Sequence, residues 1–396
     1  MRPDVVVIGG GPAGLATAIA ASSRGLSCLV LDRRTPPIDK ACGEGLMPDA
    51  LRALHRLGVA VEPADGASFR GIRFVDGETR VEAAFPEGFG RGLRRPCLHR
   101  RLVERADRVG VGLRWNARIE LIDGHTVRVD GDTIRCHWLI GADGPQSWVR
   151  RWAGLDRVRR DEVRYGTRRH YRLPPWSEFV EVHWGPHGQF YITPVSDSEV
   201  CVVLLTRWRG YSPEAALVDF PGLADLLSGA PGTTRPRSGV SATRTLRRVA
   251  SGSVALVGDA SGSADAITGE GMAMAFREAL ALAAALERGT LAAYERAHRA
   301  IARRPRRMAR LMLTMDRWPS FRRRAMPALA RMPELFAELL ALHVGHSPRV
   351  RVLVPGSLRL AGQVLRIPPP STAVNLAGHG VDRLQPTVQG GPTNDH

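Results

Sequence analysis

The first thirty residues show a change of hydrophobic period that predicts a strand, a helix and a second strand. Residues 4–8 (DVVVI) and residues 28–31 (CLVL) are almost continuous apolar runs. Such a run is typical of a parallel strand that is covered on both faces. Between the two runs, apolar residues at helical spacing extend to about Arg24. This succession predicts the strand–helix–strand unit of an α/β protein.

The middle of the chain alternates between apolar and polar positions, which predicts strands with one buried face. Helical spacing returns over residues 48–57 and 97–109. From about residue 163 to 207 the pattern is that of strands alone, with turns rich in Gly, Pro, Asp and Ser. The predicted strands lie near residues 71–75, 79–85, 112–122, 126–129, 133–140, 165–173, 179–184, 189–195 and 199–205.

Helical spacing dominates the C-terminal third, where we predict helices over residues 271–287 and 291–316. Residues 324–343 carry Met and Leu at helical spacing among arginines. This segment is either a helix that packs on the body with a solvated arginine face, or an amphipathic helix at a lipid interface. Beyond about Pro368, a Pro-Pro-Pro run and a Gly-, Asn- and Gln-rich end predict a disordered tail.

The charge is unusual for a chain whose composition is otherwise that of an ordinary globular protein. The 396 residues have a formal net charge of +17. The basic residues are arginines spread over every segment, and Lys40 is the only lysine. No zinc-finger spacing or aromatic RNA-binding signature accompanies this charge. We therefore predict no nucleic-acid partner.

The cysteines and the apolar runs indicate the cellular compartment in which we expect the protein. Five cysteines are widely separated and never form a CxxC pair, so the sequence predicts neither a disulfide framework nor a metal site. A core strand begins within three residues of Met1, which leaves no room for a signal peptide. No apolar run approaches the ~18 residues that span a bilayer. We expect a cytoplasmic protein, with a peripheral membrane contact left open and the oligomeric state undetermined.

A glycine-rich turn, Gly9-Gly-Gly11-Pro12-Ala13-Gly14, joins the first strand to the first helix. In a dinucleotide-binding βαβ unit, the first glycine makes the tight turn, the second lets a pyrophosphate approach the backbone, and the third lets the helix pack closely. The second strand ends at Asp32-Arg33, 18 residues beyond the last glycine. A carboxylate at that place binds a ribose hydroxyl. The alternative is a βαβ unit that binds no nucleotide.

A second motif follows the apolar residues 254–257. Gly258-Asp259 places a carboxylate at a strand end, where it can accept a hydrogen bond from a polyol such as a ribityl chain. Gly269-Glu-Gly271-Met272 then opens a helix, whose free N–H groups can face the electron-rich edge of an isoalloxazine. The alternative is a strand, a turn and an apolar helix that only pack in an α/β core.

The order of the motifs resembles that of FAD proteins of the p-hydroxybenzoate hydroxylase fold. Between the two glycine motifs lie Arg95-x-x-Leu98-x-x-x-Leu102 and Gly141-Ala-Asp143-Gly144, and the resemblance spans residues 4 to about 290. Lys40-Ala-Cys42-Gly43-Glu44-Gly45 and Asp265-Ala-Ile-Thr-Gly-Glu-Gly resemble the geranylgeranyl-reductase-like branch. That branch is also similar to flavoprotein hydroxylases of bacterial polyketide and phenolic-lipid pathways.

The resemblance implies an α/β fold with a Rossmann-like FAD-binding domain, an inserted, mainly antiparallel β substrate domain and a C-terminal helical segment. We expect the FAD-binding domain in two parts, with strands of about residues 66–90 contributing to the roof over the flavin. The expected boundaries are 1–155 for its first part, 156–250 for the substrate domain, 251–300 for its second part, 301–367 for the helical segment and 368–396 for the tail.

The resemblance also implies a role for each motif residue. The three glycines of the first turn would hold the FAD pyrophosphate, Asp32 the adenosine ribose, Arg95 the ribityl and phosphate region, and Asp259 the ribityl hydroxyls. Asp143 would belong to a motif that is needed both for FAD and for the use of a nicotinamide reductant. Because the reductant visits such proteins transiently, the lack of a second GxGxxG motif is compatible with NADH or NADPH.

Cys42, in the loop with Gly43 and Gly45, is the candidate catalytic residue. In the reductases that this chain resembles, a cysteine here faces the substrate side of the flavin. Its thiol would donate a proton to a carbanion after hydride transfer, or it would only shape the pocket. Lys40, two residues earlier, would steer a phosphate or stabilise reduced flavin. The alternative is that this single lysine remains among the arginines of the chain by chance and has no such role.

The sequence is compatible with several classes of reaction. Oxygen activation on the flavin would make the protein an NAD(P)H-driven monooxygenase of a hydrophobic aromatic or polyketide-derived substrate. Hydride transfer to an alkene would make it an isoprenoid reductase. Residues 189–194 (QFYITP) keep a Tyr and a Pro of the reductases' YxWxFP motif but lack its Trp and second aromatic residue, which favours oxygenation. A halogenase would carry a WxWxIP motif, which is absent, and a flavoprotein maturation factor would act on a protein partner.

Overall fold

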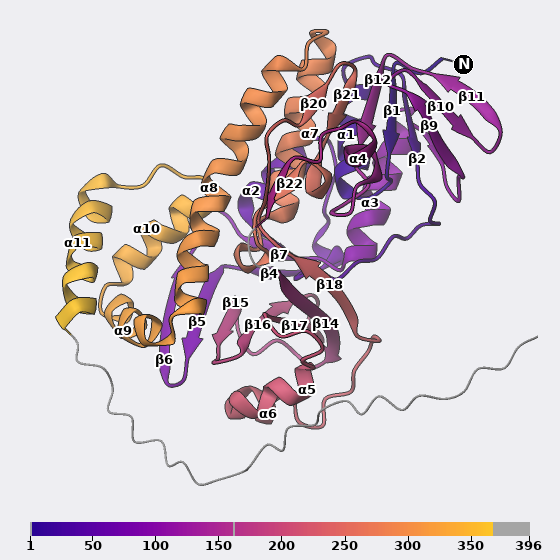
Figure 1. Cartoon of the computed structure of the whole chain (residues 1–396). Helices are drawn as coiled ribbons and strands as arrows, with labels where there is room; N and C mark the ends of the chain where they lie inside the picture. Colours follow the sequence, from indigo (N-terminus) through magenta and orange to yellow (C-terminus); the bar gives the residue numbers. More distant parts are fainter. Residues whose placement is uncertain (1, 161–162, 367–396) are drawn as a thin grey trace, which may run out of the picture.

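A six-stranded sheet forms the core of the upper half of the molecule in the computed structural model, which describes residues 2–160 and 163–366 (Figure 1). Val5, Val6 and Val7 of its central strand are completely buried, as the apolar run predicts. The strands run parallel except at one edge, where β20 pairs antiparallel with β21. In sheet order they are β20 (Ala250–Ser251), β21 (Val254–Leu256), β12 (Trp138–Gly141), β1 (Val5–Ile8), β2 (Cys28–Leu31) and β8 (Gly112–Arg114).

Helices and a small sheet cover this main sheet. Helix α1 packs against α3 and α7, and α7 also contacts α2 and α8. Apolar residues of these helices, of the main sheet and of a three-stranded sheet belong to one buried cluster. The bounds are α1 (Pro12–Ser22), α2 (Pro48–Arg56), α3 (Arg95–Arg108), α7 (Gly271–Glu287) and α8 (Ala292–Arg317), with β9 (Ile119–Asp123), β10 (Thr126–Val129) and β11 (Asp132–Arg135) in the small sheet.

A seven-stranded sheet forms the opposite half of the molecule (Figure 1). Its pairings are antiparallel except that of β15 with β5, where two segments from distant parts of the sequence join. We call it the roof sheet. In order, it contains β18 (Arg237–Ser241), β14 (Arg164–Arg172), β17 (Glu199–Thr206), β16 (Gly188–Pro194), β15 (Phe179–Trp184), β5 (Gly71–Asp76) and β6 (Thr79–Ala84).

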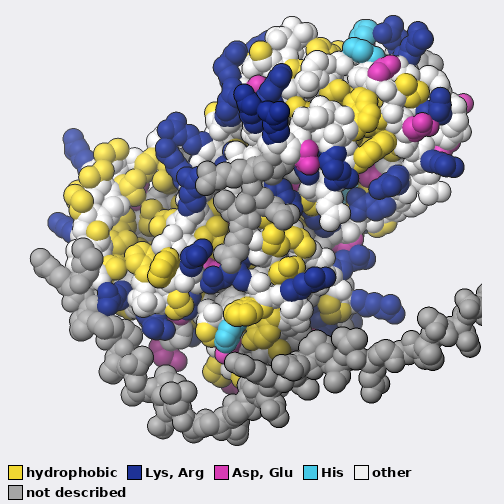
Figure 2. Space-filling model, viewed as in Figure 1, with side chains coloured by type: hydrophobic (Ala, Val, Ile, Leu, Met, Phe, Trp, Pro, Cys, Tyr) yellow, Lys and Arg dark blue, Asp and Glu magenta, His cyan; other side chains and the backbone are white. Residues whose placement is uncertain are grey.

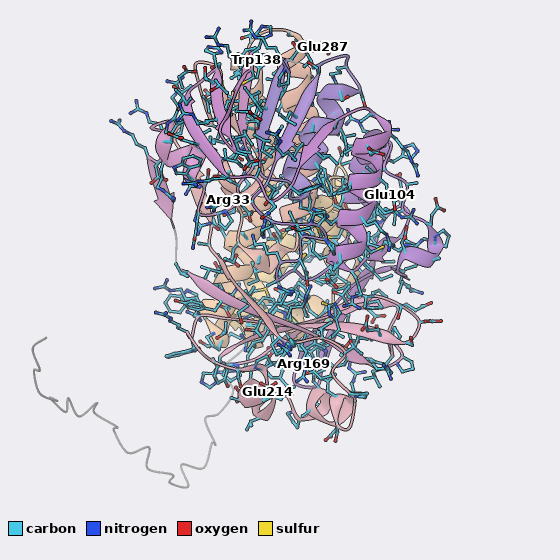
Figure 3. All side chains as sticks on the ribbon, turned by 90° about the vertical axis from the view of Figure 1, so that its right-hand side faces the viewer. Arg33, Glu104, Trp138, Arg169, Glu214 and Glu287 are labelled. Atoms are coloured by element: carbon cyan, nitrogen blue, oxygen red, sulfur yellow. The ribbon has the colours of Figure 1, made fainter. Side chains whose placement is uncertain are left out.

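Short elements connect the two halves. Two small three-stranded sheets contain β3 (Gly45–Leu46), β7 (Gly90–Gly92) and β4 (Ala67–Phe69), and β13 (Val158–Arg160), β19 (Arg244–Leu246) and β22 (Gly262–Ser263). Figure 3 places Trp138 and Glu287 at the end formed by the main sheet and its helices, and Arg169 and Glu214 at the opposite end. The two halves are therefore stacked along one axis.

The C-terminal helices pack beside the roof sheet. They are α9 (Pro319–Ala330), α10 (Pro333–His343) and α11 (Val350–Arg366), and α9 and α10 contact β6. The predicted segment 324–343 is divided at Met332, whose φ of −129° and ψ of 61° leave the helical range just before α10 begins at Pro333. Met326, Leu329 and Phe336 are buried against the roof sheet. The packed-helix interpretation of this segment is therefore correct, and the lipid-interface interpretation is wrong.

Other sequence predictions need smaller corrections. The predicted strand 112–122 is two strands that belong to different sheets, separated near Asn116, which has a φ of +53°. Residues 133–140 likewise divide between β11 and β12. Two helices that the sequence pattern did not predict, α5 (Pro213–Ala216) and α6 (Pro221–Leu227), cover the outer face of the roof sheet, where Phe220 contacts Phe190. The predicted disordered tail lies outside the described residues.

Within residues 2–160 and 163–366, no helix has both the length and the apolar character to cross a bilayer. Their longest helix, α8, has 26 residues but carries arginines along its length and Pro305 in its interior.

Candidate functional site

The turn between β1 and α1 is built from glycines whose hydrogen atoms face neighbouring backbone. Gly9 has a φ of +109° and lies against Ala142, and Gly14 lies against the Gly9 carbonyl. Gly11 differs, because a Cβ atom added there would meet no protein atom within 4 Å. The N-terminus of α1 has no side-chain cap. Its first N–H groups are therefore free to bind an anion beside Gly11.

Asp32 lies at the end of β2 and is 6% exposed. One carboxylate oxygen accepts a hydrogen bond from Gly10 N at 2.7 Å, and the other accepts one from Arg34 N at 2.8 Å. These bonds fix the carboxylate beside the glycine turn, and each oxygen keeps a lone pair for a hydroxyl. Arg33, which lies between Asp32 and Arg34 in the sequence, is exposed.

Gly258 brings the second motif against the first. It has a φ of +63°, and a Cβ atom added there would lie 2.6 Å from Cβ of Ala13. Asp259 follows, and its Oδ2 accepts a hydrogen bond from Nζ of Lys40 at 2.8 Å. Burial by itself would raise the pKa of Asp259, but the charges of Lys40, Arg95 and Arg244 outweigh it and lower the pKa. Three cationic side chains thus surround this strand end.

Glu278 of α7 supports the Gly258 turn from the protein interior. Its Oε2 accepts hydrogen bonds from Gly258 N at 2.8 Å and from Ser261 Oγ at 3.2 Å. Burial raises the pKa of this carboxyl to about 8, and burial lowers the pKa of the neighbouring His298 to about 4. Both groups are therefore neutral near pH 7.

The raised pKa of Glu278 predicts a loss of stability as the solution becomes alkaline. The unfolded chain titrates near 4.5 and the folded protein near 8. Between these values only the folded state binds the proton, so the stability from this group declines as pH rises and is lost above the folded pKa. The decline is up to about 5 kcal/mol. In Glu278→Gln, which keeps an acceptor without titrating, we expect a shallower decline of the melting temperature between pH 5 and 9.

The matched control for this experiment is Glu287→Gln at the end of the same helix, where the side chain is 53% exposed and faces Arg24. This variant should follow the parent protein. Parallel pH curves for the parent and Glu278→Gln would contradict the assignment of a neutral carboxyl to Glu278.

The Gly269–Gly271 segment forms a second uncapped helix start. Gly269 has a φ of +68°, and α7 begins two residues later at Gly271, without a side-chain cap from Glu270. A Cβ atom added at either glycine would meet no protein atom within 4 Å. Met272 is half-buried against the main core. The predicted helix start is present, with open space at both glycines.

The Lys40–Gly45 loop passes between the main sheet and the roof sheet. Cys42 is half-buried, and its Sγ accepts a hydrogen bond from Glu44 N at 3.4 Å. A Cβ atom added at Gly43 would meet nothing within 4 Å, whereas Gly45 lies close to Thr193 and Val180 of the roof sheet. The loop therefore has one open side and one side packed on the roof.

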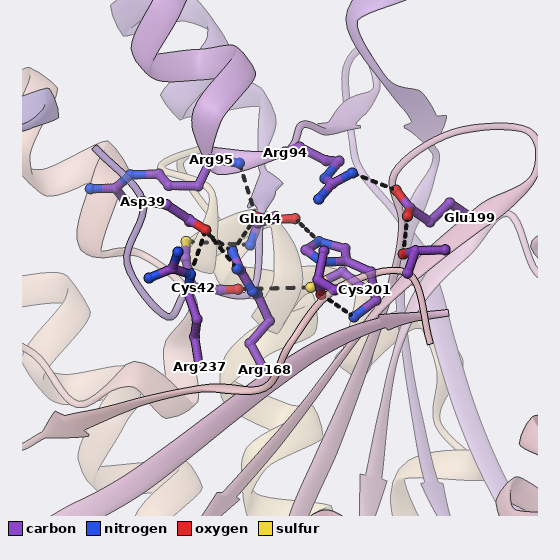
Figure 4. A network of polar contacts seen from close by, with 12 residues as sticks. Asp39, Cys42, Glu44, Arg94, Arg95, Arg168, Glu199, Cys201 and Arg237 are labelled. Atoms are coloured by element: carbon purple, nitrogen blue, oxygen red, sulfur yellow. Dashed lines mark hydrogen bonds and ion pairs between the residues drawn. The ribbon is translucent and has the colours of Figure 1, made fainter. Parts of the chain in front are cut away.

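Glu44 is the junction of this loop with both halves of the molecule (Figure 4). It is 1% exposed and has a φ of +59°. Its Oε1 accepts hydrogen bonds from Arg95 N at 2.9 Å and from Arg168 Nη1 at 2.8 Å. Its Oε2 lies 2.6 Å from Nε2 of His170. One buried carboxylate thus holds the start of α3 and strand β14 together.

The network continues to the loop's edge through Asp39. Arg168 donates two hydrogen bonds to its carboxylate, at 3.0 and 2.9 Å, and Arg237 lies 2.8 Å from it (Figure 4). The positive charge of Arg168 thereby offsets two acidic groups. Burial alone would raise the pKa of Asp39, but the hydrogen bonds and charge of Arg168 lower it.

Sequence reasoning did not identify Asp39, Glu44, Arg168 or His170 as site residues. A signal was present at two of these positions: Arg168 and His170 alternate along a strand, so that both side chains point to one face. Their common partner, Glu44, could not be identified from this pattern because it lies 124 residues away from Arg168 in sequence.

The side chains of Glu44, His170 and Cys201 offer three possible metal-ligand atoms within 4.8 Å of one another. We interpret this group as a hydrogen-bonded network. The Arg168 guanidinium already neutralises Glu44, and burial raises the pKa of the Cys201 thiol well above its usual value. A metal cation would have to displace the first and deprotonate the second.

Asp143 and Arg95 occupy the two flanks of the site. Asp143 accepts hydrogen bonds from Trp148 N at 2.7 Å and Val149 N at 3.1 Å, the first two N–H groups of α4 (Trp148–Trp152). Its other oxygen, Oδ1, is buried without a partner, as is Nε of Arg95 at the start of α3. Each flank therefore presents one polar atom without a protein partner.

Comparison with known proteins identifies the family. A family model described as FAD binding domain matches residues 2–200. The chain belongs to this family. Its named relatives are reductases and monooxygenases, so that it is a member of a family of FAD-dependent oxidoreductases.

Three relatives illustrate the range of this family. The chain is 36% identical to menaquinone reductase of Mycobacterium tuberculosis (strain ATCC 25618 / H37Rv) in an alignment that covers 38% of this chain and only 40% of that protein. It is 30% identical to menaquinone reductase of Mycolicibacterium smegmatis over 68% of this chain and 73% of that protein. It is 31% identical to 3-amino-4-hydroxybenzoate 2-monooxygenase PtnB3 of Streptomyces platensis over 59% of this chain and 67% of that protein.

Solved structures share the fold. The flavin-dependent brominase Bmp2 superposes with a TM-score of 0.76 at 19% identity, covering 92% of this chain and 98% of the brominase. A geranylgeranyl bacteriochlorophyll reductase-like protein from Thermoplasma acidophilum gives a TM-score of 0.68 at 19% identity, covering 91% of this chain and 96% of that one. These proteins have different activities, so the common fold does not specify the reaction.

Proposed function

We propose that FAD lies across the carboxyl edge of the main sheet, between the two glycine motifs. Gly11 and Gly271 leave open space at two helix N-termini that have no side-chain cap. Nε of Arg95 is buried on the same side without a protein partner. Uncapped N–H groups suit a pyrophosphate at α1 and the electron-rich edge of a flavin at α7. These features fit FAD.

In this arrangement each motif residue has one task. Residues 9–14 hold the pyrophosphate, Asp32 binds the adenosine ribose, and Arg95 neutralises the phosphate region. Lys40 donates to Oδ2 of Asp259 and leaves Oδ1 for a ribityl hydroxyl. The hydrogen bonds of Asp143 to the start of α4 fix the end of β12 beside the cofactor.

We propose further that the protein is an NAD(P)H-driven monooxygenase of a hydrophobic aromatic or polyketide-derived substrate. When bound, FAD would supply the redox chemistry that connects a nicotinamide to O2. The supporting observation is the inner face of β16. Tyr191 there uses its hydroxyl to bind the carbonyl of Ile267 at 2.9 Å, and Thr193 packs beside Gly45. Tyr191 offers a smaller aromatic surface than the Trp of the prenyl reductases' motif, and Thr193 offers none. The Streptomyces monooxygenase relative agrees with this assignment.

The protein's own residues would exclude water and position the ring. The roof sheet covers the 42–45 loop, and the Glu44 network fixes that loop between α3 and β14. A dry pocket with fixed dipoles is what oxygen transfer to a bound ring requires.

The second candidate is reduction of an isoprenoid double bond. Its support is the menaquinone reductase of Mycolicibacterium smegmatis, which aligns over 68% of this chain. In that reaction the Cys42 thiol would donate the proton that follows hydride transfer.

One experiment separates the candidates. Flavin-loaded protein is mixed with NADH or NADPH, and oxidation of the nicotinamide is followed without substrate and with added phenols, alkylphenols or prenylated quinones. For the monooxygenase we expect stimulation by a phenol, consumption of O2 and a product heavier by one oxygen atom. A product heavier by two hydrogen atoms under anaerobic conditions would establish the reductase instead. A response only in the presence of a protein partner would indicate a maturation factor.

Replacement of Cys42 by serine tests its part in the chemistry. If the thiol only lines the pocket, kcat for hydroxylation should stay within about threefold of the parent value. Loss of a general acid would lower kcat by about 10²-fold or more. Cys97→Ser is the control, because Cys97 is also half-buried but binds Asp65 outside the site. A large loss confined to Cys42→Ser would contradict the pocket-lining role.

A further inference from the structure

Helix α11 is fixed to the molecule by one face. Leu353 and Leu360 pack against the core cluster that α9 and α10 share with the roof sheet. Gly356 lies against Leu335 of α10, where an added Cβ atom would come within 3.0 Å of the leucine side chain. This close contact sets the rotation of the helix about its axis. The opposite face is therefore presented outward in one defined orientation.

The outward face carries a stripe of large aliphatic side chains. Val350, Val354 and Leu358 are 64%, 51% and 70% exposed. Their spacing of four residues places them on successive turns of one side of the helix. Scattered exposed aliphatic residues are ordinary, but three aligned ones on one helix mark an interaction surface.

Positive charge borders this stripe. At 100° per residue, Arg351 lies next to Leu358 on the helix surface, and Arg359 lies beyond it on the same side. Both arginines are exposed. The sequence of α11 contains no Asp or Glu. Figure 2 shows hydrophobic side chains gathered over the C-terminal helices, with Lys and Arg side chains around them.

An aliphatic stripe beside arginines is complementary to the surface of an anionic bilayer. The acyl region accepts the aliphatic side chains, and lipid phosphates bind the guanidinium groups. The formal charge of +17 on the whole chain adds long-range attraction toward such a surface. A neutral bilayer would accept the aliphatic side chains, but it would offer neither anionic lipids for the guanidinium groups nor long-range attraction for the charge of the chain.

We propose that α11 is a membrane-docking helix, which inserts Val350, Val354 and Leu358 into the interface of an anionic bilayer while Arg351 and Arg359 bind lipid phosphates. This surface is distinct from the cofactor site and does not depend on which reaction the protein catalyses. We thus assign the lipid contact to α11. The sequence had suggested residues 324–343 for this contact, but the apolar residues of that segment pack against the rest of the molecule.

The test is sedimentation of the full-length, flavin-loaded protein with large unilamellar vesicles. Vesicles of phosphatidylcholine alone are compared with vesicles that contain 30% phosphatidylglycerol. We expect binding to the anionic vesicles, weaker binding at high salt and little binding to the neutral ones. Leu358→Glu should weaken binding by about tenfold or more, because it places a carboxylate in the apolar stripe. Arg351→Glu should weaken it through the phosphate contacts.

Val218→Glu is the matched control, because Val218 is 83% exposed but lies next to α5 on the outer face of the roof sheet, away from α11 (Figure 1). It should bind as the parent protein does, and all three variants should keep the parent melting temperature. Equal binding by the parent and Leu358→Glu, or no binding by the parent, would overturn the proposal. Self-association without lipid that Leu358→Glu abolishes would also overturn it, and would identify a second copy of the chain as the occupant.

Discussion

Gly11→Val should give a colourless protein that folds but does not retain FAD. At Gly11 the backbone has φ −73° and ψ 177°, which valine adopts without strain. A Cβ atom at this position meets no protein atom within 4 Å, so the branched side chain fits the apoprotein. It would occupy the space that we assign to the pyrophosphate. We therefore expect loss of the flavin absorbance and of NAD(P)H oxidation, with apoprotein stability within about 1 kcal/mol of the parent.

The control distinguishes a blocked site from a damaged fold. At Gly222 an added Cβ atom also meets nothing within 4 Å, but this glycine lies in α6 on the outer face of the roof sheet. Gly222→Val should retain FAD. Stability of both apoproteins is measured by denaturant unfolding, and FAD retention by absorbance after gel filtration. Full flavin content in Gly11→Val would contradict the proposed position of the pyrophosphate.

Glu44→Gln should destabilise the protein by about 2–4 kcal/mol, because it leaves the buried Arg168 guanidinium with less compensation. Arg168 is 1% exposed and would keep only Asp39 as an anionic partner. A glutamine oxygen in place of Oε1 can accept from Arg95 N and Arg168, but the NH2 group then faces His170 in place of Oε2. We also expect weaker FAD retention, since the loop from Lys40 to Gly45 loses its fixed connection to α3 and β14.

Denaturant unfolding of the apoprotein and FAD titration measure the two effects separately. Glu178→Gln is the control, because its carboxylate is 78% exposed and lies 3.5 Å from Arg70. An exposed pair of this kind contributes at most about 1 kcal/mol. If Glu44→Gln were as stable as Glu178→Gln, the Glu44 network would not hold the two halves together.

Much of the main sheet could be predicted from short segments of sequence. The run at residues 5–8 is buried on both faces of a parallel sheet, and this environment favours apolar residues. The predicted helix at residues 271–287 matches α7 at both ends. The pattern was less informative where helices are short. Helices α5 and α6 begin at Pro213 and Pro221 and have too few turns to establish a helical period.

In the candidate site, too, some features could be predicted from the sequence and others could not. Gly9 and Gly258 could be assigned to turns because each has a positive φ, a backbone requirement that is local to the residue. The partners of the charged residues could not be assigned. Lys40 is 219 residues from Asp259, and Glu44 is 126 residues from His170. No periodicity relates positions so far apart.

The sequence by itself determined the first two strands, the glycine turns and the cofactor class, since these depend on a residue and its neighbours along the chain. Only the tertiary structure decided that one carboxylate, Glu44, joins the Cys42 loop to the roof sheet, and that α11 rather than residues 324–343 presents an apolar face. The physical reason is that both outcomes depend on which surfaces of separate elements pack together. Amphipathic spacing shows that a helix has two faces, but the remaining elements determine which face is covered.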